Sequence, residues 1–216
     1  MFNSEQYLDE YVRVLRRLDS AMIERMAELL VGAWRTRTTV FLCGNGGSAA
    51  SASHLATDLS KLTAPAHGPR LRAMALNEST SSISAIGNDI AYEDIFAEQL
   101  RTFGNRSDIV IGLSTSGSSP NVLRAVDYAN SIGAVTLGIT GQQGAKLQQL
   151  ARHTLIVDST SVQHVEDATM VAGHMLCLRV RHALSVLHIQ SRFRPAVVVP
   201  SAPSIAVGAP APGLNG

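Results

Sequence analysis

The fold is decided by the stretch TVFLCGNGGSAASASH, residues 39–54. Its first five residues are mostly apolar and are followed by glycines, which predicts a buried strand over residues 39–43. The glycines at 44–47 predict a turn, and the small residues from Ser48 predict a helix that runs to about Lys61. A strand that turns directly into a helix is the unit of α/β proteins, whose ligands bind at the carboxyl ends of strands.

The same alternation continues along the chain. Further strands are expected at residues 71–76, 108–113, 134–140 and 154–157, and further helices at residues 80–88, 92–103, 120–132, 146–151 and 162–190. Residues 5–34 carry apolar side chains at three- and four-residue steps, which predicts one long amphipathic helix. We therefore predict a doubly wound parallel sheet of the flavodoxin-like kind, flanked by helices. The long first and last helices carry more apolar surface than one sheet can cover, which favours their use in oligomerisation.

Length and composition favour one domain over residues 1–194. The 216 residues include 18 basic and 17 acidic side chains, and this balance argues against nucleic-acid binding. No apolar run approaches the roughly 20 residues of a membrane helix. We therefore expect no membrane partner. Cys43 and Cys177 lie among apolar neighbours, so we expect buried thiols and a cytoplasmic protein. Residues 195–216 are rich in Pro, Ala and Val and predict a flexible tail, unless residues 197–199 dock as an edge strand.

The glycine turn is the first candidate binding site, with Asn45, Gly46, Gly47 and Ser48 as its members. Glycines let a ligand approach the backbone, and the start of the following helix favours anions. The turn also satisfies the loose dinucleotide pattern G-x-G-x-x-A, which requires an acidic residue about 20 positions later. The nearest candidate, Glu78, comes too late, so we predict no nucleotide cofactor. A glycine turn without a ligand remains the simpler alternative.

A second candidate loop has the sequence STSGSS, residues 114–119. Five hydroxyl side chains lie between an expected strand and an expected helix, where hydroxyls and helix-start amides can surround a phosphate group. The Gly-Lys-Ser/Thr of nucleotide triphosphatases is missing. Serines also serve as turn and capping residues, but their number favours phosphate binding. The candidate ligands are Ser114, Thr115, Ser116 and Ser119.

Two histidines and two carboxylates form the third candidate set. His54 and Asp58 are four residues apart and share a helix face, and Glu166 and His174 are eight apart on the last helix. Two imidazoles and two carboxylates can hold a divalent metal or act as acid and base. Taken alone, each pair is as compatible with a solvated helix face.

Together these residues resemble the phosphoheptose isomerase branch of the sugar isomerase (SIS) domain family. The resemblance covers about residues 5–188 and rests on GNGGSAASASH at 44–54, the Asn88-Asp89-x-x-Tyr92-Glu93-Asp94 stretch, STSGSS and the last helix. It implies a SIS-type fold, a homotetramer with sites at subunit boundaries, and in some members a zinc ion. It also implies conversion of sedoheptulose 7-phosphate to D-glycero-D-manno-heptose 7-phosphate.

The resemblance also implies residue roles. It puts Asn45, Gly46, Gly47, Asn88 and Asp89 at the sugar of a phosphorylated sugar substrate, and the serine-loop residues at its phosphate. His54 and His174 match metal-binding histidines, and His174 also matches an acid/base. The chain departs from the family twice, with Asp58 in place of Glu and Glu166 in place of Gln. Either the pocket suits a related sugar phosphate, or the geometry compensates.

The implied reaction is an aldose–ketose isomerisation through an enediol. It requires a carboxylate base near C1 and C2, for which Asp58 and Glu166 are candidates, and an acid, for which we expect His174. A zinc ion held by His54, Asp58, Glu166 and His174 would polarise the carbonyl. The two assignments conflict if a metal ligand must also be the base, and the sequence leaves open which role Asp58 and Glu166 each take. A non-catalytic SIS protein that binds phosphosugars remains an alternative, which the retained acid/base set disfavours. An isomerase of another sugar phosphate is the other alternative.

Overall fold

The computed structural model describes residues 3–64 and 68–192. Residues 195–216, for which the sequence predicts a tail, lie outside the described residues, as does the alternative docking of residues 197–199. Among the described residues, no helix is both long and apolar enough to cross a membrane.

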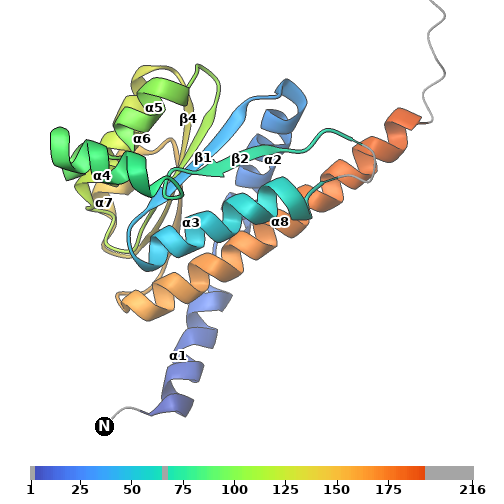
Figure 1. The fold of residues 1–216 in the computed structure, drawn as a ribbon. Coiled ribbons are helices and arrows are strands. Elements are labelled where there is room, and N and C mark those ends of the chain that lie inside the picture. The colour runs from blue at the N-terminus through green and yellow to red at the C-terminus, as the bar shows by residue number, and fades with distance from the viewer. Residues whose placement is uncertain (1–2, 65–67, 193–216) are drawn as a thin grey trace, which may run out of the picture.

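A five-stranded parallel sheet forms the centre of the molecule, which confirms the predicted fold class (Figure 1). The strand order is β2-β1-β3-β4-β5. The strands are β1 (Thr39–Gly44), β2 (Arg72–Ala75), β3 (Ile109–Ser114), β4 (Val135–Gly141) and β5 (His153–Val157). This order is that of flavodoxin-like sheets, and it puts the topological switch point between the neighbouring strands β1 and β3.

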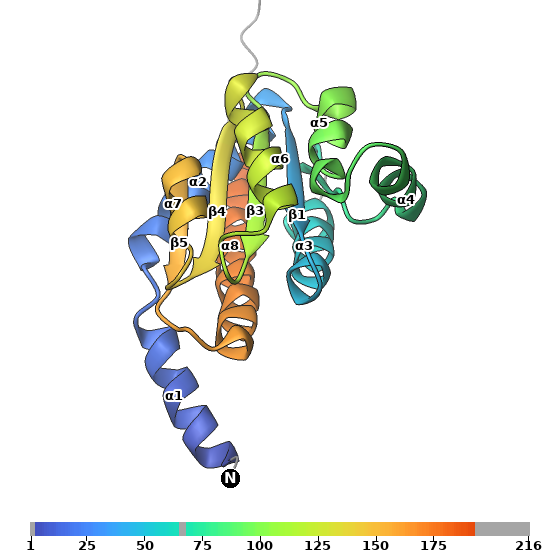
Figure 2. The same cartoon turned by 90° about the vertical axis from the view of Figure 1, so that its left-hand side faces the viewer.

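Helices cover both faces of the sheet (Figure 2). On one face, apolar side chains of α2, α3 and α8 pack against the strands, and on the other those of α5, α6 and α7 do so. The helical segments are α1 (Ser4–Arg16), α2 (Ser20–Thr36), α3 (Gly47–Thr57), the π-helical turn η1 (Asp58–Leu62), α4 (Thr80–Asp89), the 3-10 turn η2 (Tyr92–Asp94), α5 (Ala97–Phe103), α6 (Pro120–Ser131), α7 (Ala145–Leu150) and α8 (Val162–Arg192).

The predicted single helix over residues 5–34 is wrong, because the structure divides it into α1 and α2. Asp19 caps the second helix, and its carboxylate accepts the Met22 N–H at 3.0 Å. A capping aspartate competes with continued helical hydrogen bonding, so the chain turns there. The predicted helix over residues 92–103 is likewise divided into η2 and α5.

Helix α1 projects beyond the rest of the domain and meets the start of α8 (Figures 1 and 2). The Tyr7 hydroxyl donates to Asp167 at 2.7 Å, and this hydrogen bond raises the pKa of Tyr7 to about 12. Val14 packs with Val157 and Val165 in a small apolar cluster. Much of the remaining α1 surface faces solvent, including Leu8.

Candidate active site

The glycine loop (residues 44–47) follows β1 at the switch point of the sheet. Gly46 has a φ of +53°, in the region that side chains other than glycine rarely adopt. A Cβ on Gly44 would lie 2.8 Å from Ser48, so the turn is also too tight for a larger residue there. Helix α3 starts directly at Gly47 without a side-chain cap, which leaves its first N–H groups available to a ligand.

The serine loop (residues 114–119) follows β3, next to the glycine loop. The hydroxyls of Ser114 and Ser119 lie 3.1 Å apart, and Ser116 Oγ accepts the N–H and O–H of Ser118. Ser119 is the N-cap residue of α6, but its side chain makes no capping hydrogen bond. Hydroxyls therefore gather at the carboxyl end of a central strand, next to the start of α6. A small pocket beside them is lined by Thr115, Ser116, Gln143, Ser159, Thr160, Val162 and Val165.

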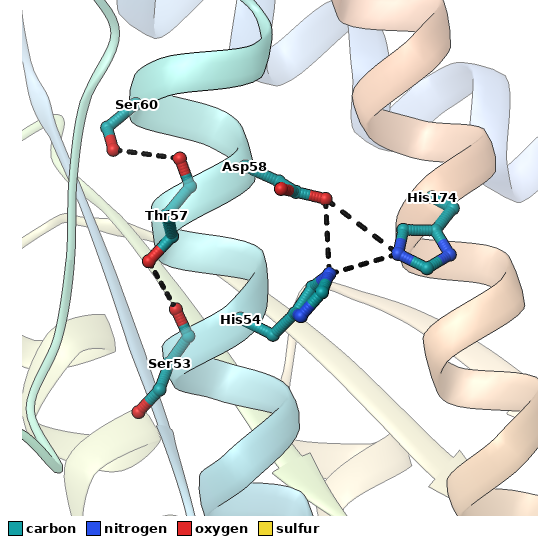
Figure 3. A network of polar contacts seen from close by, with 6 residues as sticks. All are labelled: Ser53, His54, Thr57, Asp58, Ser60 and His174. Atoms are coloured by element: carbon teal, nitrogen blue, oxygen red, sulfur yellow. Dashed lines mark hydrogen bonds and ion pairs between the residues drawn. The ribbon is translucent and has the colours of Figure 1, made fainter.

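Three of the four expected acid/base and metal residues form one cluster (Figure 3). His54 Nε2 lies 3.0 Å from His174 Nε2 and 3.3 Å from Asp58 Oδ2, and His174 Nε2 lies 3.8 Å from the same oxygen. His54 comes from α3, Asp58 opens η1, and His174 comes from the middle of α8. The imidazoles are about half exposed, at 50% and 49%, so the cluster faces outward from this chain.

Close packing of α3 against α8 brings the cluster together. Gly173 precedes His174, and a Cβ on Gly173 would overlap Leu55 of α3. The glycine therefore lets the two helices approach closely enough for the histidines to meet. The α-helical pattern also widens to a π-helical turn at Asp58, a local form that is frequent at functional sites.

The donor atoms fit a divalent metal. In tetrahedral zinc sites the ligand bonds are about 2.0–2.2 Å long, which separates the donor atoms by roughly 3.3 Å. The three separations in the cluster, 3.0, 3.3 and 3.8 Å, bracket that value. Two imidazoles and one carboxylate also match the three-ligand set of catalytic zinc sites, which keep a fourth position open.

Glu166 lies apart from this cluster, contrary to the expected four-ligand set. Its half-buried carboxylate lies against Gly47, where a Cβ would overlap both of its oxygens. Eight residues of α-helix correspond to a rise of about 12 Å, which separates Glu166 from His174 along α8. The structure therefore brings Glu166 to the glycine loop and the start of α3.

Asn88 and Asp89 are exposed at the end of α4, and the Asn88 amide donates to the Asp89 carboxylate at 2.7 Å. Helix α4 lies to the side of the sheet, away from α8 (Figures 1 and 2). Tyr92, in the η2 turn that follows α4, lies closer to the glycine loop, and its hydroxyl is 3.5 Å from Asn45 Oδ1.

Sequence reasoning missed Asn121, which pairs with Asn45 of the glycine loop through two hydrogen bonds. Its signal in the sequence was weak, because an asparagine after the proline that starts a helix is typical of a surface turn. An exposure of 1% distinguishes it from such a residue.

Both cysteines are free and buried, as predicted. Burial raises the pKa of Cys43 to about 12, and burial together with the charge of Asp58 raises that of Cys177 to about 12. The thiols are therefore protonated at neutral pH, which argues against a role as nucleophiles.

Both the sequence and the fold are similar to those of known proteins. The sequence pattern of the SIS domain matches residues 6–141. The phosphoheptose isomerase of Pelodictyon phaeoclathratiforme is 41% identical over 162 residues, which cover 74% of this chain and 77% of that protein. That of Solidesulfovibrio magneticus is 36% identical over 189 residues, covering 84% and 92%. The solved phosphoheptose isomerase of Neisseria gonorrhoeae superimposes with a TM-score of 0.76 at 28% identity, covering 82% of this chain and 96% of that one.

Proposed function

The chain belongs to the SIS domain family, among the phosphoheptose isomerases, and from this premise we propose that it interconverts sedoheptulose 7-phosphate and D-glycero-D-manno-heptose 7-phosphate. The observation that carries the proposal is the cluster of His54, Asp58 and His174 on and beside α3, the helix that begins at the glycine loop. Acid/base groups and two ligand loops thus share one region of the fold.

The serine loop is the proposed phosphate site. Hydroxyls of Ser114, Thr115, Ser116 and Ser119 offer hydrogen-bond donors to a phosphate dianion, and the positive end of the α6 dipole favours its charge. The glycine loop then faces the sugar, together with Asn45, Ser48 and, through the neighbouring η2 region, Asn88 and Asp89. The carboxylate of Glu166 at Gly47 accepts hydrogen bonds from sugar hydroxyls, so this residue binds substrate rather than metal.

Asp58 is the proposed base and His174 the proposed acid. Proton removal and carbonyl protonation occur on adjacent carbons, so the two groups must lie close together, as Asp58 and His174 do. Both imidazole contacts of Asp58 use Oδ2, which leaves Oδ1 to take the proton. One carboxylate can therefore act as ligand and as base, which the sequence alone left in conflict.

We also propose that the cluster holds a divalent cation, with zinc as the best match to two imidazoles and one carboxylate. When bound, the ion supplies Lewis-acid polarisation of the substrate carbonyl. His54, Asp58 and His174 are the residues that would hold it.

The half-exposed cluster and the projecting helix α1 support a homotetramer with sites at subunit boundaries. The two buried thiols support a cytoplasmic location. Both are proposals that rest on family membership and on these features.

The function is tested by incubating the protein with sedoheptulose 7-phosphate in deuterated water and following deuterium entry at C1 and appearance of the aldose by NMR. Asp58→Asn and His174→Gln should each lower the rate about 10²–10⁴-fold, the range for loss of general acid–base catalysis. Tight binding of the sugar phosphate without deuterium exchange would contradict the isomerase activity and indicate a phosphosugar-binding protein. Deuterium exchange with a different ketose phosphate, and none with sedoheptulose 7-phosphate, would indicate that the other compound is the substrate.

For the metal, protein purified without chelator should contain about one equivalent of zinc per chain, the stoichiometry of a three-ligand site. His54→Ala should lose the ion while keeping the fold, because its half-exposed ring carries little core packing. The matched control is His182→Ala on the exposed surface of α8, which should retain it. Apoprotein with unchanged activity after chelation would remove the metal from the reaction.

A further inference from the structure

Asn45 and Asn121 join the two ligand loops through their side-chain amides. Asn45 Nδ2 donates to Asn121 Oδ1 at 2.8 Å, and Asn121 Nδ2 donates to Asn45 Oδ1 at 2.9 Å. Asn45 belongs to the glycine loop after β1, and Asn121 is the second residue of α6, two residues after the end of the serine loop. The pair therefore bridges 76 residues of chain across the switch point of the sheet.

Asn121 is buried with an exposure of only 1%. Its Oδ1 also accepts the N–H of Val122 at 3.0 Å, so its amide is held from two directions. A buried amide without partners is costly, and this one is satisfied only while the glycine loop stays in place. The orientation of Asn45 is thus coupled to the start of α6.

Asn45 is held from its other side as well. Its Oδ1 lies 3.5 Å from the Tyr92 hydroxyl, at the outer limit of a hydrogen bond. Its Nδ2 uses one hydrogen for Asn121, and among the described residues no partner takes the second. One amide N–H with a fixed direction therefore remains for a ligand at the glycine loop.

We propose that Asn121 is a positioning residue that sets the glycine loop at a fixed distance and angle from the serine loop. This inference rests on the proposed function, because it requires a ligand that spans both loops, a sugar at the first and a phosphate at the second. Such a ligand gains affinity only if both loops are held in register before it binds. Inorganic phosphate, which uses the serine loop alone, gains nothing from the pair.

The alternative is that Asn121 only caps the start of α6 through Val122. Asn121→Asp separates the two roles, because it keeps the shape and the acceptor for Val122 but replaces the donor to Asn45 with a second oxygen. A carboxylate near a helix start is favourable for the helix, so a pure capping role predicts an unchanged ratio of the affinities for the two ligands. Asn121→Ala provides a second variant if burial of the carboxylate prevents folding.

The experiment measures affinity for sedoheptulose 7-phosphate and for inorganic phosphate by isothermal titration calorimetry. In Asn121→Ala the dissociation constant for the sugar phosphate should rise about tenfold, equivalent to about 1.4 kcal/mol, with that for phosphate changed less than about twofold. In Asn121→Asp the added negative charge weakens binding of both phosphorylated ligands, so the expected result is about a tenfold rise in the ratio of the two dissociation constants. The matched control is Asn130→Ala, at the other end of α6. Asn130 also makes two side-chain hydrogen bonds, to Leu150 and Thr136, so its loss should lower stability and leave the ratio of the two affinities unchanged.

A double-mutant cycle shows whether Asn121 acts through Asn45. Asn45→Ala with Asn121→Ala should lose no more sugar-phosphate affinity than Asn45→Ala alone, because the position of an absent side chain no longer matters. Equal losses for both ligands, or additive losses in the double variant, would overturn the inference. A wild-type protein that binds the sugar phosphate without isomerising it would defeat the proposed function alone, and one that binds neither ligand would defeat both.

Discussion

At the scale of single residues, Gly47 decides where the Glu166 carboxylate can lie. A methyl group at Gly47 would overlap that carboxylate, which is the flexible end of a long side chain and can move away. Gly47→Ala should therefore keep the fold but displace Glu166 from the glycine loop, with a loss of about 10–100-fold in kcat/KM, as for a misplaced ligand-binding group. Steady-state kinetics and thermal unfolding together measure the two effects.

The matched control is Gly32→Ala in the middle of α2, where nothing lies within 4 Å of the new Cβ. It should leave kcat/KM unchanged and stabilise the protein by about 0.5–1 kcal/mol, because alanine is the better helix former. Full activity in Gly47→Ala would show that the Glu166 position plays no part in turnover.

Ser119 tests the phosphate site. Its side chain makes no capping hydrogen bond and contacts the Ser114 hydroxyl at 3.1 Å, so Ser119→Ala should lower stability by no more than about 1 kcal/mol. If the hydroxyl binds the phosphate, affinity for inorganic phosphate should fall by about 1–3 kcal/mol, the cost of losing a hydrogen bond to a charged group. Ser131→Ala, at the exposed end of the same helix, is the control and should bind phosphate normally. Normal binding in both variants would exclude Ser119 as a phosphate ligand.

Spacing along one element predicted part of the site. His54 and Asp58 share a helix face whatever the rest of the chain does, because four residues correspond to about one turn. Glu166 and His174 were harder to interpret, since an eight-residue spacing fixes a shared face but not which neighbour each side chain meets. Because Gly47 has no side chain, the Glu166 carboxylate can lie against the glycine loop. Asn121 escaped notice because its burial depends on the packing of two loops that are distant in sequence.

At the scale of elements, the contact between α3 and α8 depends on Gly173. A Cβ there would overlap Leu55, which is 2% exposed and has little room to move. Gly173→Ala should destabilise the protein by about 1–3 kcal/mol through overpacking. It should also separate His54 from His174 and lower zinc affinity. Thermal unfolding and metal titration of this variant test the packing and the cluster separately, and Gly32→Ala again serves as the control. Unchanged stability and metal content would mean that the helix contact is adaptable.

Strands were easier to predict than helix ends. Three of the five strands, β1, β3 and β4, are buried over most of their length, so their apolar runs mark them clearly in the sequence. The sequence did not predict the break in the expected helix over residues 5–34, because apolar periodicity continues through Leu18. The capping role of Asp19 became evident only from its hydrogen bond in the structure. Periodicity reports which side of a segment is buried, and it does not report where the chain changes direction.

At the scale of the whole molecule, apolar side chains remain exposed on the two helices expected to meet other subunits. Leu8 and Val12 on α1 are 59% and 43% exposed, and Met175, Leu178 and Val186 on α8 also face solvent. Three of these lie along the helix that carries His174, so a subunit covering them would also enclose the half-exposed cluster. Enclosure excludes water and strengthens electrostatic interactions there.

Light scattering should therefore give a mass about four times the 22.9 kDa of one chain at micromolar concentration, as the family pattern implies. Leu178→Glu should dissociate the assembly and lower activity together, because it introduces a charge next to the cluster-bearing surface. Phe103→Glu on α5 is the matched control, since Phe103 is similarly exposed, at 52%, but lies on a helix packed on the opposite face of the sheet. A wild-type monomer with full activity would show that one chain completes the site. Dissociation by both variants would mean that the interface is not confined to α1 and α8.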